Sequence, residues 1–181
     1  MGNIDWDKIE EENKSEFKPY AKNGTHEVEL ESVTQKTAGT GTIFFEFNFK
    51  EGDDVQYPKV SRALFKDEKK SFRIHHYKEI MVVLGASETN ARKAVEVCEG
   101  KSNREAIADA YTETFNRLAQ KHPKVKLEVT TETNNGKDYA RGEFADERVH
   151  FSGKKQANKS TEVIPTDDEV SGDISLEDLP F

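Results

Sequence analysis

The chain has 181 residues, of which 34% are apolar and 34% charged, and its formal net charge is −8. This length favours one domain with tails over several domains, and the low apolar share indicates that part of the chain does not pack into a core. A single cysteine, Cys98, excludes an intramolecular disulfide and a zinc site built from several thiolates.

Membrane and export signals are missing from the sequence. The longest apolar run, residues 80–84, ends at Gly85, whereas a transmembrane helix needs about 20 apolar residues. Residues 1–7 lack the basic start and apolar stretch of a signal peptide. We therefore expect a cytoplasmic protein with no membrane partner.

The charges are segregated along the chain. Residues 161–181 contain seven Asp or Glu and no Lys or Arg, and residues 1–12 contain five acids and one lysine. Residues 13–160 therefore carry 26 bases and 23 acids, with the densest run of bases between residues 59 and 78. The negative total thus conceals a mildly basic body with an acidic end, which leaves nucleic-acid binding open.

The first half of the chain has the period of β-strands. Residues 24–35 alternate polar and apolar side chains, and residues 42–50 place four apolar side chains on one face with Phe44 on the other. Residues 55–65 predict a third strand that Pro58 interrupts, which suits an edge or a bulge. Turns at residues 37–41 and 52–54 would join the three strands into an antiparallel meander.

Helical spacing replaces the strand period after residue 66. Apolar side chains recur every three or four residues from Phe72, and Ser87 predicts the start of a second helix that ends near Cys98. Ser102 with Glu105 forms a capping box for a third helix, which we expect to end at His122, before Pro123.

Strand alternation returns at residues 125–130, and Asn134–Gly136 is a hairpin turn after which residues 139–151 can pair back. The prediction is a mainly β, α+β fold: a five-stranded antiparallel OB-fold barrel with a helical insertion after the third strand. We expect an N-terminal arm (1–20), an OB-fold domain (21–151, insertion 66–122) and a disordered linker with an acidic tip (152–181).

Enzyme signatures are not found. The sequence contains no phosphate loop, dinucleotide-binding turn, nucleophile elbow or helical zinc pair. His75 and His76 are adjacent and would face different sides of a helix, and Asp53 and Asp54 beside Gly52 are typical of a turn. We expect neither a catalytic site nor a metal or cofactor site.

The C-terminal segment has the composition of a peptide ligand. Acidic residues lead to an apolar end, so a partner could hold the ring of Phe181 in a pocket and face the acids with a basic rim. The residues of this interaction tip are Asp173, Glu177, Asp178, Leu179, Pro180 and Phe181.

The sequence Asp178-Leu179-Pro180-Phe181 resembles the C-terminal tip of single-stranded DNA-binding proteins of bacteria and their phages. The body more loosely resembles a phage family of small proteins encoded beside replication and recombination genes. That likeness rests on Gly24-Thr25, the turn around Gly39, the aromatic second strand, Leu64-Phe65 before a basic helix, and the late strand with its Asn-Gly turn.

The resemblance implies a phage protein in the bacterial host cytoplasm that coats single-stranded DNA during replication or recombination, without sequence specificity. Its tip would recruit replication, recombination and repair enzymes. The segment 66–122 is longer than the corresponding helix of the bacterial family, which leaves the oligomeric state, including a homo-oligomer, open.

A groove for single strands needs cations for phosphates and rings on which bases stack. For Phe44 and Tyr57, stacking on a base and packing in the core are equally compatible with the pattern. The alternatives in function are a recombination mediator that loads an annealase or a helicase, an acidic DNA-mimic inhibitor, and a nuclease. The candidate DNA-binding residues are Phe44, Tyr57, Lys59, Arg62, Phe65, Arg73, Lys126, Lys137, Tyr139 and Arg141.

Overall fold

The computed structural model describes residues 18–147. The acidic tip and the two ends of the chain lie outside this range. In chain order the elements are β1 (Gly24–Thr37), β2 (Ile43–Phe49), β3 (Val60–Ala63), the short 3-10 helix η1 (Asp67–Lys69), α2 (Lys70–Val83), α3 (Glu88–Glu99), α4 (Arg104–Ala119), β4 (Lys124–Asn134) and β5 (Lys137–Phe144).

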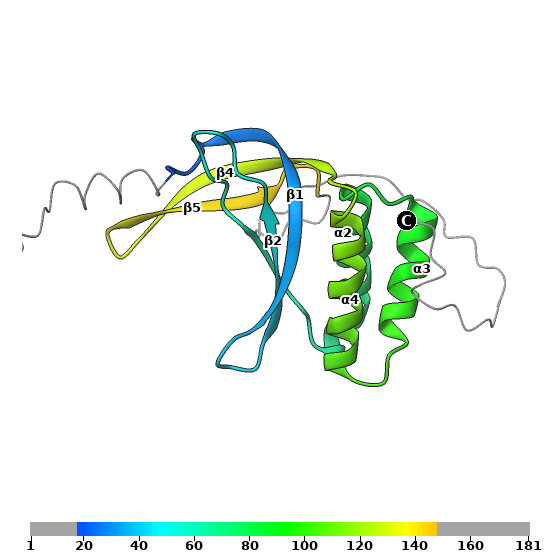
Figure 1. Cartoon of the computed structure of the whole chain (residues 1–181). Helices are drawn as coiled ribbons and strands as arrows, with labels where there is room; N and C mark the ends of the chain where they lie inside the picture. The colour runs from blue at the N-terminus through cyan, green and yellow to red at the C-terminus, as the bar shows by residue number, and fades with distance from the viewer. Residues whose placement is uncertain (1–17, 148–181) are drawn as a thin grey trace, which may run out of the picture.

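The strands form one antiparallel sheet in the order β3-β2-β1-β4-β5 (Figure 1). The long strand β1 has two partners, because residues 24–29 pair with β4 and residues 30–37 pair with β2. A β-bulge between Leu30 and Ser32 separates the two halves. The strict alternation that we expected along this strand is therefore wrong beyond Leu30: the bulge moves Ser32 to the outer face and buries Val33.

The helices lie together on one side of the sheet (Figure 1). The apolar face of β2 packs against α2 and α4, where Phe45, Tyr77, Tyr111 and Phe115 meet mostly edge to face. Asn116 fixes α4 to β1, because its side chain accepts from the Val33 backbone N–H at 2.9 Å and donates to the Val33 carbonyl at 2.8 Å. The sequence prediction that Ile43, Phe45, Phe47 and Phe49 share a buried face is confirmed.

Two of the predicted helix starts can be compared with the caps. Ser87 precedes α3 and accepts a hydrogen bond from the Asn90 N–H, as expected. The predicted capping box at Ser102 is wrong by one residue, since Asn103 caps α4 by accepting from the Ala106 N–H at 2.8 Å. Asparagine and serine side chains are equally good N-caps. The cap is therefore set by the backbone, and it falls on Asn103, which has the extended conformation of a residue that precedes a helix.

The third strand is shorter than predicted. Ladder pairing begins only at Val60, so Tyr57 and Lys59 precede β3 rather than belonging to it. Pro58 has no N–H for the ladder, which explains why the pairing starts after it. Gln56 instead forms an isolated parallel bridge with Tyr20.

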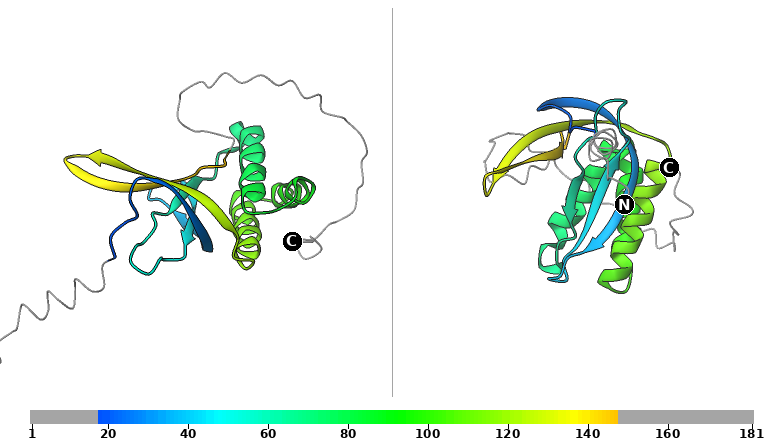
Figure 2. Two further views of the ribbon diagram at one scale, coloured as in Figure 1. Left: turned by 90° about the horizontal axis from the view of Figure 1, so that it is seen from above. Right: turned by 60° about the vertical axis from the view of Figure 1, so that its left-hand side comes forward.

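The predicted hairpin turn between β4 and β5 is confirmed. Asn135 and Gly136 have φ values of 52° and 74°, as a tight two-residue turn requires. The hairpin extends away from the helices in Figures 1 and 2, and residues 130–139 are all exposed. Its second strand ends at Phe144, and the predicted continuation beyond residue 147 lies outside the described residues.

The free edges of β3 and β5 face each other. Arg62 of β3 donates to Glu143 of β5, and a Cβ on Gly142 would come within 2.8 Å of the Pro58 carbonyl oxygen. No strand ladder joins the two edges within residues 18–147, so the sheet is not closed there. The α+β class, the five antiparallel strands and the helices after the third strand are as predicted. None of the described helices is long and apolar enough to cross a membrane.

Candidate nucleic-acid interface

The outer face of β1, β2 and β3 presents an aromatic ring. Phe44 is half-buried on the face of β2 opposite the Phe45, Phe47 and Phe49 stripe. Its partner in β1 is Lys36 and its partner in β3 is Ala63, so a base lying on this ring would be beside an ammonium group. We call Lys36, Phe44, Glu46, Asn48 and Lys59 the outer patch.

Two lysines of the outer patch share one carboxylate. Glu46 accepts from the Lys36 Nζ at 2.8 Å and from the Lys59 Nζ at 3.2 Å. Burial acts to raise the pKa of Glu46, but the two ammonium groups outweigh it and lower that pKa. Because the single negative charge faces two positive charges, the cluster keeps one uncompensated positive charge beside Phe44.

The outer patch continues into a polar row. The Asn48 amide nitrogen donates to the Ser32 and Thr34 hydroxyl oxygens, both at 3.3 Å. These three side chains lie on the outer face of the β1–β2 ladder, where Ser32 and Asn48 are register partners. They provide neutral donors and acceptors next to the basic cluster.

The other candidate rings of the sheet lie apart from Phe44. Tyr57 is half-buried, packs against the core, and contacts the His26 ring at a centroid distance of 5.8 Å. His26 is ten residues before Lys36 in β1, so Tyr57 and Phe44 are far apart along that strand. Phe65 is half-buried and contacts the Phe72 ring edge to face at 5.1 Å.

Arg62 lies in the gap between β3 and β5. Its side chain is one-tenth exposed, donates to Glu143 and, at 2.5 Å, to Glu147, and lies over the Phe144 ring at 5.9 Å. Glu147 is also 3.2 Å from Nδ1 of the buried His76 of α2. Arg62 therefore connects β3, β5 and α2 and is committed to two carboxylates.

Arg73 is a core residue. It is 1% exposed and donates to both Glu99 carboxylate oxygens, at 2.8 and 2.5 Å, and to the Phe65 carbonyl at 2.6 Å. Glu99 also accepts from the Tyr111 hydroxyl at 2.8 Å. These contacts hold α2, α3 and α4 together and leave no surface of the guanidinium for a phosphate.

The remaining candidates share one face of the β4–β5 hairpin. Tyr139 is 54% exposed, and Arg141 is exposed and donates to Glu132 at 2.6 Å. Lys126 and Lys137 are also exposed, with Lys126 3.6 Å from Asp146. Acidic residues lie between these bases, so the hairpin combines one exposed ring with cations, without a strongly basic surface.

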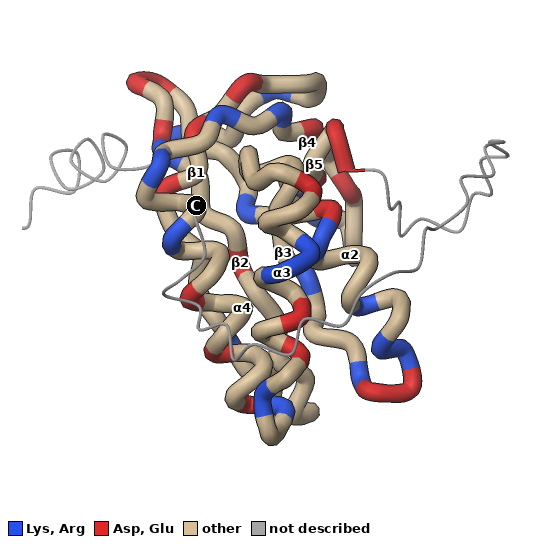
Figure 3. Tube along the Cα trace, turned by 90° about the vertical axis from the view of Figure 1, so that its right-hand side faces the viewer, with Lys and Arg blue, Asp and Glu red and all other residues tan. Residues whose placement is uncertain are grey.

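The structure thus separates the predicted set. Phe44 and Lys59 lie in the outer patch, the hairpin holds Lys126, Lys137, Tyr139 and Arg141, and Arg62 and Arg73 are paired inside. Tyr57 and Phe65 lie apart from all of these, beside His26 and Phe72. Lys36 was missed by the sequence analysis, although the short turn after residue 37 could have placed it opposite Phe44. Figure 3 shows acidic and basic residues interspersed over the helical side rather than a face of one sign.

Within the described residues, no group of three or more His, Cys, Asp or Glu side chains could hold a metal ion. A scan against protein-family models finds no match to the chain. A search of curated proteins likewise finds no similar sequence. The function must therefore be argued from the residues themselves.

Proposed function

We propose that the protein binds single-stranded DNA without sequence specificity, and that the outer patch is the centre of its binding surface. The observation that carries the proposal is Phe44, a ring on the outer face of β2 with Lys36 opposite it in β1 and with Lys59 paired to Glu46, two residues along β2. Stacking on an aromatic ring does not depend on the base, and lysines beside the ring would contact the phosphates on either side of it. The absence of sequence specificity follows from these two kinds of contact.

The strand order supports an OB-type barrel as the finer description of the fold. In that barrel the face of the second and third strands, and the loops after the first and fourth strands, bind oligonucleotides. Here the corresponding parts are the outer patch, the turn at residues 38–42 and the β4–β5 hairpin. The Arg62–Glu143 pair would take the place of the hydrogen-bond ladder that closes such a barrel between β3 and β5.

The contacts that we propose differ from those expected from sequence at four positions. Arg62 and Arg73 are left out, because both are committed to buried or half-buried carboxylates. Phe65 is left out because its ring contacts Phe72, and Lys36 is added. The proposed phosphate contacts are Lys36, Lys59, Lys126, Lys137 and Arg141, and the proposed stacking rings are Phe44 and Tyr139, with Tyr57 as a more distant third.

The proposed biological role is to coat single strands during phage replication or recombination. The tip that includes Leu179 and Phe181 would recruit the enzymes of these processes. A pull-down from bacterial lysate with wild-type and Phe181→Ala protein tests this part, and equal recovery of replication and repair enzymes by both would contradict it.

The decisive experiment on DNA binding is a titration of fluorescent oligo-dT at several salt concentrations. If four or five phosphates are neutralised, log K should fall with log salt with a slope of about −3, at roughly 0.7 for each contact. A duplex of the same length is the control and should bind more weakly. A slope near zero, or tighter binding of the duplex, would contradict the proposal; metal-dependent cleavage of the strand would indicate a nuclease instead.

A further inference from the structure

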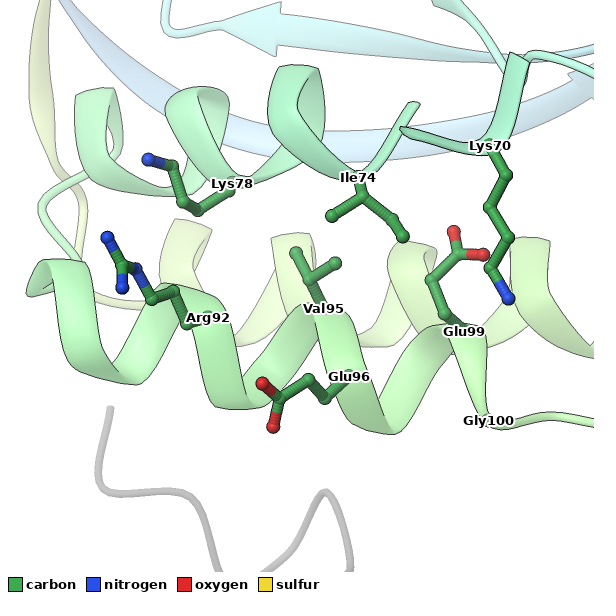
Figure 4. Close-up of a pocket in the computed structure, with 8 residues that line it drawn as sticks. All are labelled: Lys70, Ile74, Lys78, Arg92, Val95, Glu96, Glu99 and Gly100. Carbon is green, nitrogen blue, oxygen red and sulfur yellow. The ribbon is translucent and has the colours of Figure 1, made fainter. Parts of the chain in front are cut away.

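A groove between α2 and α3 lies apart from the outer patch. The cavity has a volume of about 390 Å³ and is lined by Lys70, Ile74 and Lys78 of α2 and by Arg92, Val95, Glu96, Glu99 and Gly100 at α3. Figure 4 shows Ile74 and Val95 opposite each other in the middle, with Lys78 and Arg92 toward one end and Lys70 toward the other. The groove therefore has an apolar floor, in which Ile74 is half-buried and Val95 is 2% exposed, with Lys78 and Arg92 at one end and Lys70 beside the Glu99 carboxylate at the other.

The two ends differ in how their charges are compensated. Lys78 lies 2.6 Å from a Glu88 carboxylate oxygen and 2.9 Å from one of Glu79, and Arg92 lies 3.3 Å from Glu88. Glu99 is held by Arg73. Lys70 is exposed, and no carboxylate in residues 18–147 forms an ion pair with it. The Lys70 end can therefore accept an anion without losing a contact.

We propose that this groove binds the chain's own segment 177–181, with Leu179 and Phe181 on Ile74 and Val95 and with Glu177 or Asp178 beside Lys70. In an extended peptide, residues two apart lie on the same side, about 6.6 Å from each other, and the residue between them points away. Leu179 and Phe181 would thus cover about one turn of α2, whose pitch is about 5.4 Å. The sequence of the segment matches the order of the groove: acids first, then two apolar side chains.

The connection along the chain favours the same molecule over a second copy. Glu147, the last described residue, is 3.2 Å from His76, which lies two residues beyond Ile74 in α2. The thirty residues between Glu147 and Asp178 can span up to about 100 Å, far more than this separation requires. A tethered segment has an effective concentration in the millimolar range, so weak contacts suffice for docking.

Docking would cover the residues that the proposed function assigns to partner enzymes. A partner would then have to compete with the groove for Leu179 and Phe181. Docking of the segment does not involve DNA. Docking can therefore be disproved while DNA binding is confirmed, and DNA binding can be disproved while docking is confirmed.

The test is a methyl NMR comparison of the full chain, labelled at Ile, Val and Ala, with its Phe181→Ala variant. Removal of the ring should shift the Ile74 and Val95 methyl resonances and leave the buried Ile43 methyl unchanged. Lys70→Glu should shift the Val95 methyls in the same direction, because it repels the acids from the groove. Lys93→Glu is the matched control, since Lys93 is exposed on α3 and does not line the groove, and it should leave the wild-type shifts in place.

Three results would overturn the proposal. The Ile74 and Val95 methyls could be unaffected by Phe181→Ala, or the shift could appear instead at Ala63, beside Phe44, which would place the tip on the outer patch. Groove shifts that disappear on tenfold dilution would assign the docked segment to a second copy. Docking within one chain would be supported if the Ile74 and Val95 methyls shift in Phe181→Ala, the Val95 methyls shift in Lys70→Glu, and the wild-type resonances do not change on dilution.

Discussion

The gap between β3, β5 and α2 and the outer patch on β2 both combine bases with glutamates, but they differ in burial. In the gap, Arg62 is one-tenth exposed and Glu147 is 3% exposed, and the neighbouring Arg73–Glu99 pair is equally enclosed. In the outer patch, Lys36 and Lys59 are half exposed around Glu46. Arginine–glutamate pairs therefore lie in an enclosed environment of low dielectric constant, and lysine–glutamate pairs lie at the surface.

The difference shows which charges can serve a ligand. A buried ion pair cannot lose one partner without leaving the other charge uncompensated, so its members are fixed. Glu46 is 15% exposed, but both of its lysines are half exposed to water. Ion pairs at the surface are worth about 0–1 kcal/mol, so a lysine can exchange Glu46 for a phosphate at little cost. Burial, more than the density of bases in the sequence, separates structural charges from those available for binding.

The largest expected effect comes from breaking the enclosed pair. Arg73→Ala should lower the free energy of unfolding by about 3–5 kcal/mol, because it leaves Glu99 buried without its cation. Urea denaturation measures this. Arg92→Ala, which removes an exposed i,i+4 pair with Glu88, is the control and should cost about 0.5 kcal/mol or less. A loss below about 1 kcal/mol for Arg73→Ala would mean that the pair is not enclosed as described.

The second expected effect is a dependence of the unfolding free energy on pH, which comes from His76 beside the gap between β3, β5 and α2. Burial, with the charge of Arg62 acting in the same direction, lowers the pKa of His76 to about 3. Below pH 6.5 the unfolded chain therefore binds a proton at this residue that the folded protein does not, and stability falls as the pH falls toward 3. The slope from this residue approaches about 1.4 kcal/mol per pH unit.

Urea denaturation at pH 7 and pH 5 checks this sign. In His76→Phe the unfolding free energy should differ less between the two pH values than in the wild type. The substitution His75→Gln, at an exposed position, should leave the difference as in the wild type. An equal pH dependence for wild type and His76→Phe would show that His76 is protonated in the folded protein, and the nearby Glu147 carboxylate would then be the reason.

The third prediction separates the two faces of β2. Phe44→Ala should weaken oligo-dT binding by roughly 1–3 kcal/mol and change the unfolding free energy little. The adjacent Phe45→Ala should instead cost about 3–5 kcal/mol of stability, since that ring is fully buried. If Phe44→Ala lowers stability steeply and the folded fraction binds normally, Phe44 is a packing residue and the outer patch loses its ring.

The smallest expected effect concerns single phosphate contacts. Lys36→Ala or Lys59→Ala should reduce the steepness of the salt dependence by about 0.7 each. Lys93→Ala on α3 should leave the slope unchanged. Slopes that are identical for all three variants would move the phosphate path away from the outer patch, to the hairpin.

The elements that were predictable from sequence are those with local signals. The phenylalanine stripe of β2, the Ser87 cap and the Asn-Gly turn each depend on residues a few positions apart. The roles of Arg73 and Arg62 depend on carboxylates 26 and 81 to 85 residues away, which no local pattern shows. The short turn after residue 37 would place Lys36 opposite Phe44, but strict alternation counted from residue 24 puts it on the inner face, because that pattern does not show the bulge after Leu30.

The bulge in β1 also limits how the length of this strand can change. Successive side chains of a strand point to opposite faces of the sheet. Inserting or deleting one residue on either side of the bulge would therefore exchange the inner and outer faces of one half of the strand. Glu31 is the exception, because it is the extra residue of the bulge: its deletion would leave the pairs Leu30–Phe49, Ser32–Asn48 and Val33–Phe47 in an uninterrupted ladder, with Val33 still on the inner face. Away from the bulge, insertions and deletions within residues 24–37 should therefore be tolerated only in even numbers.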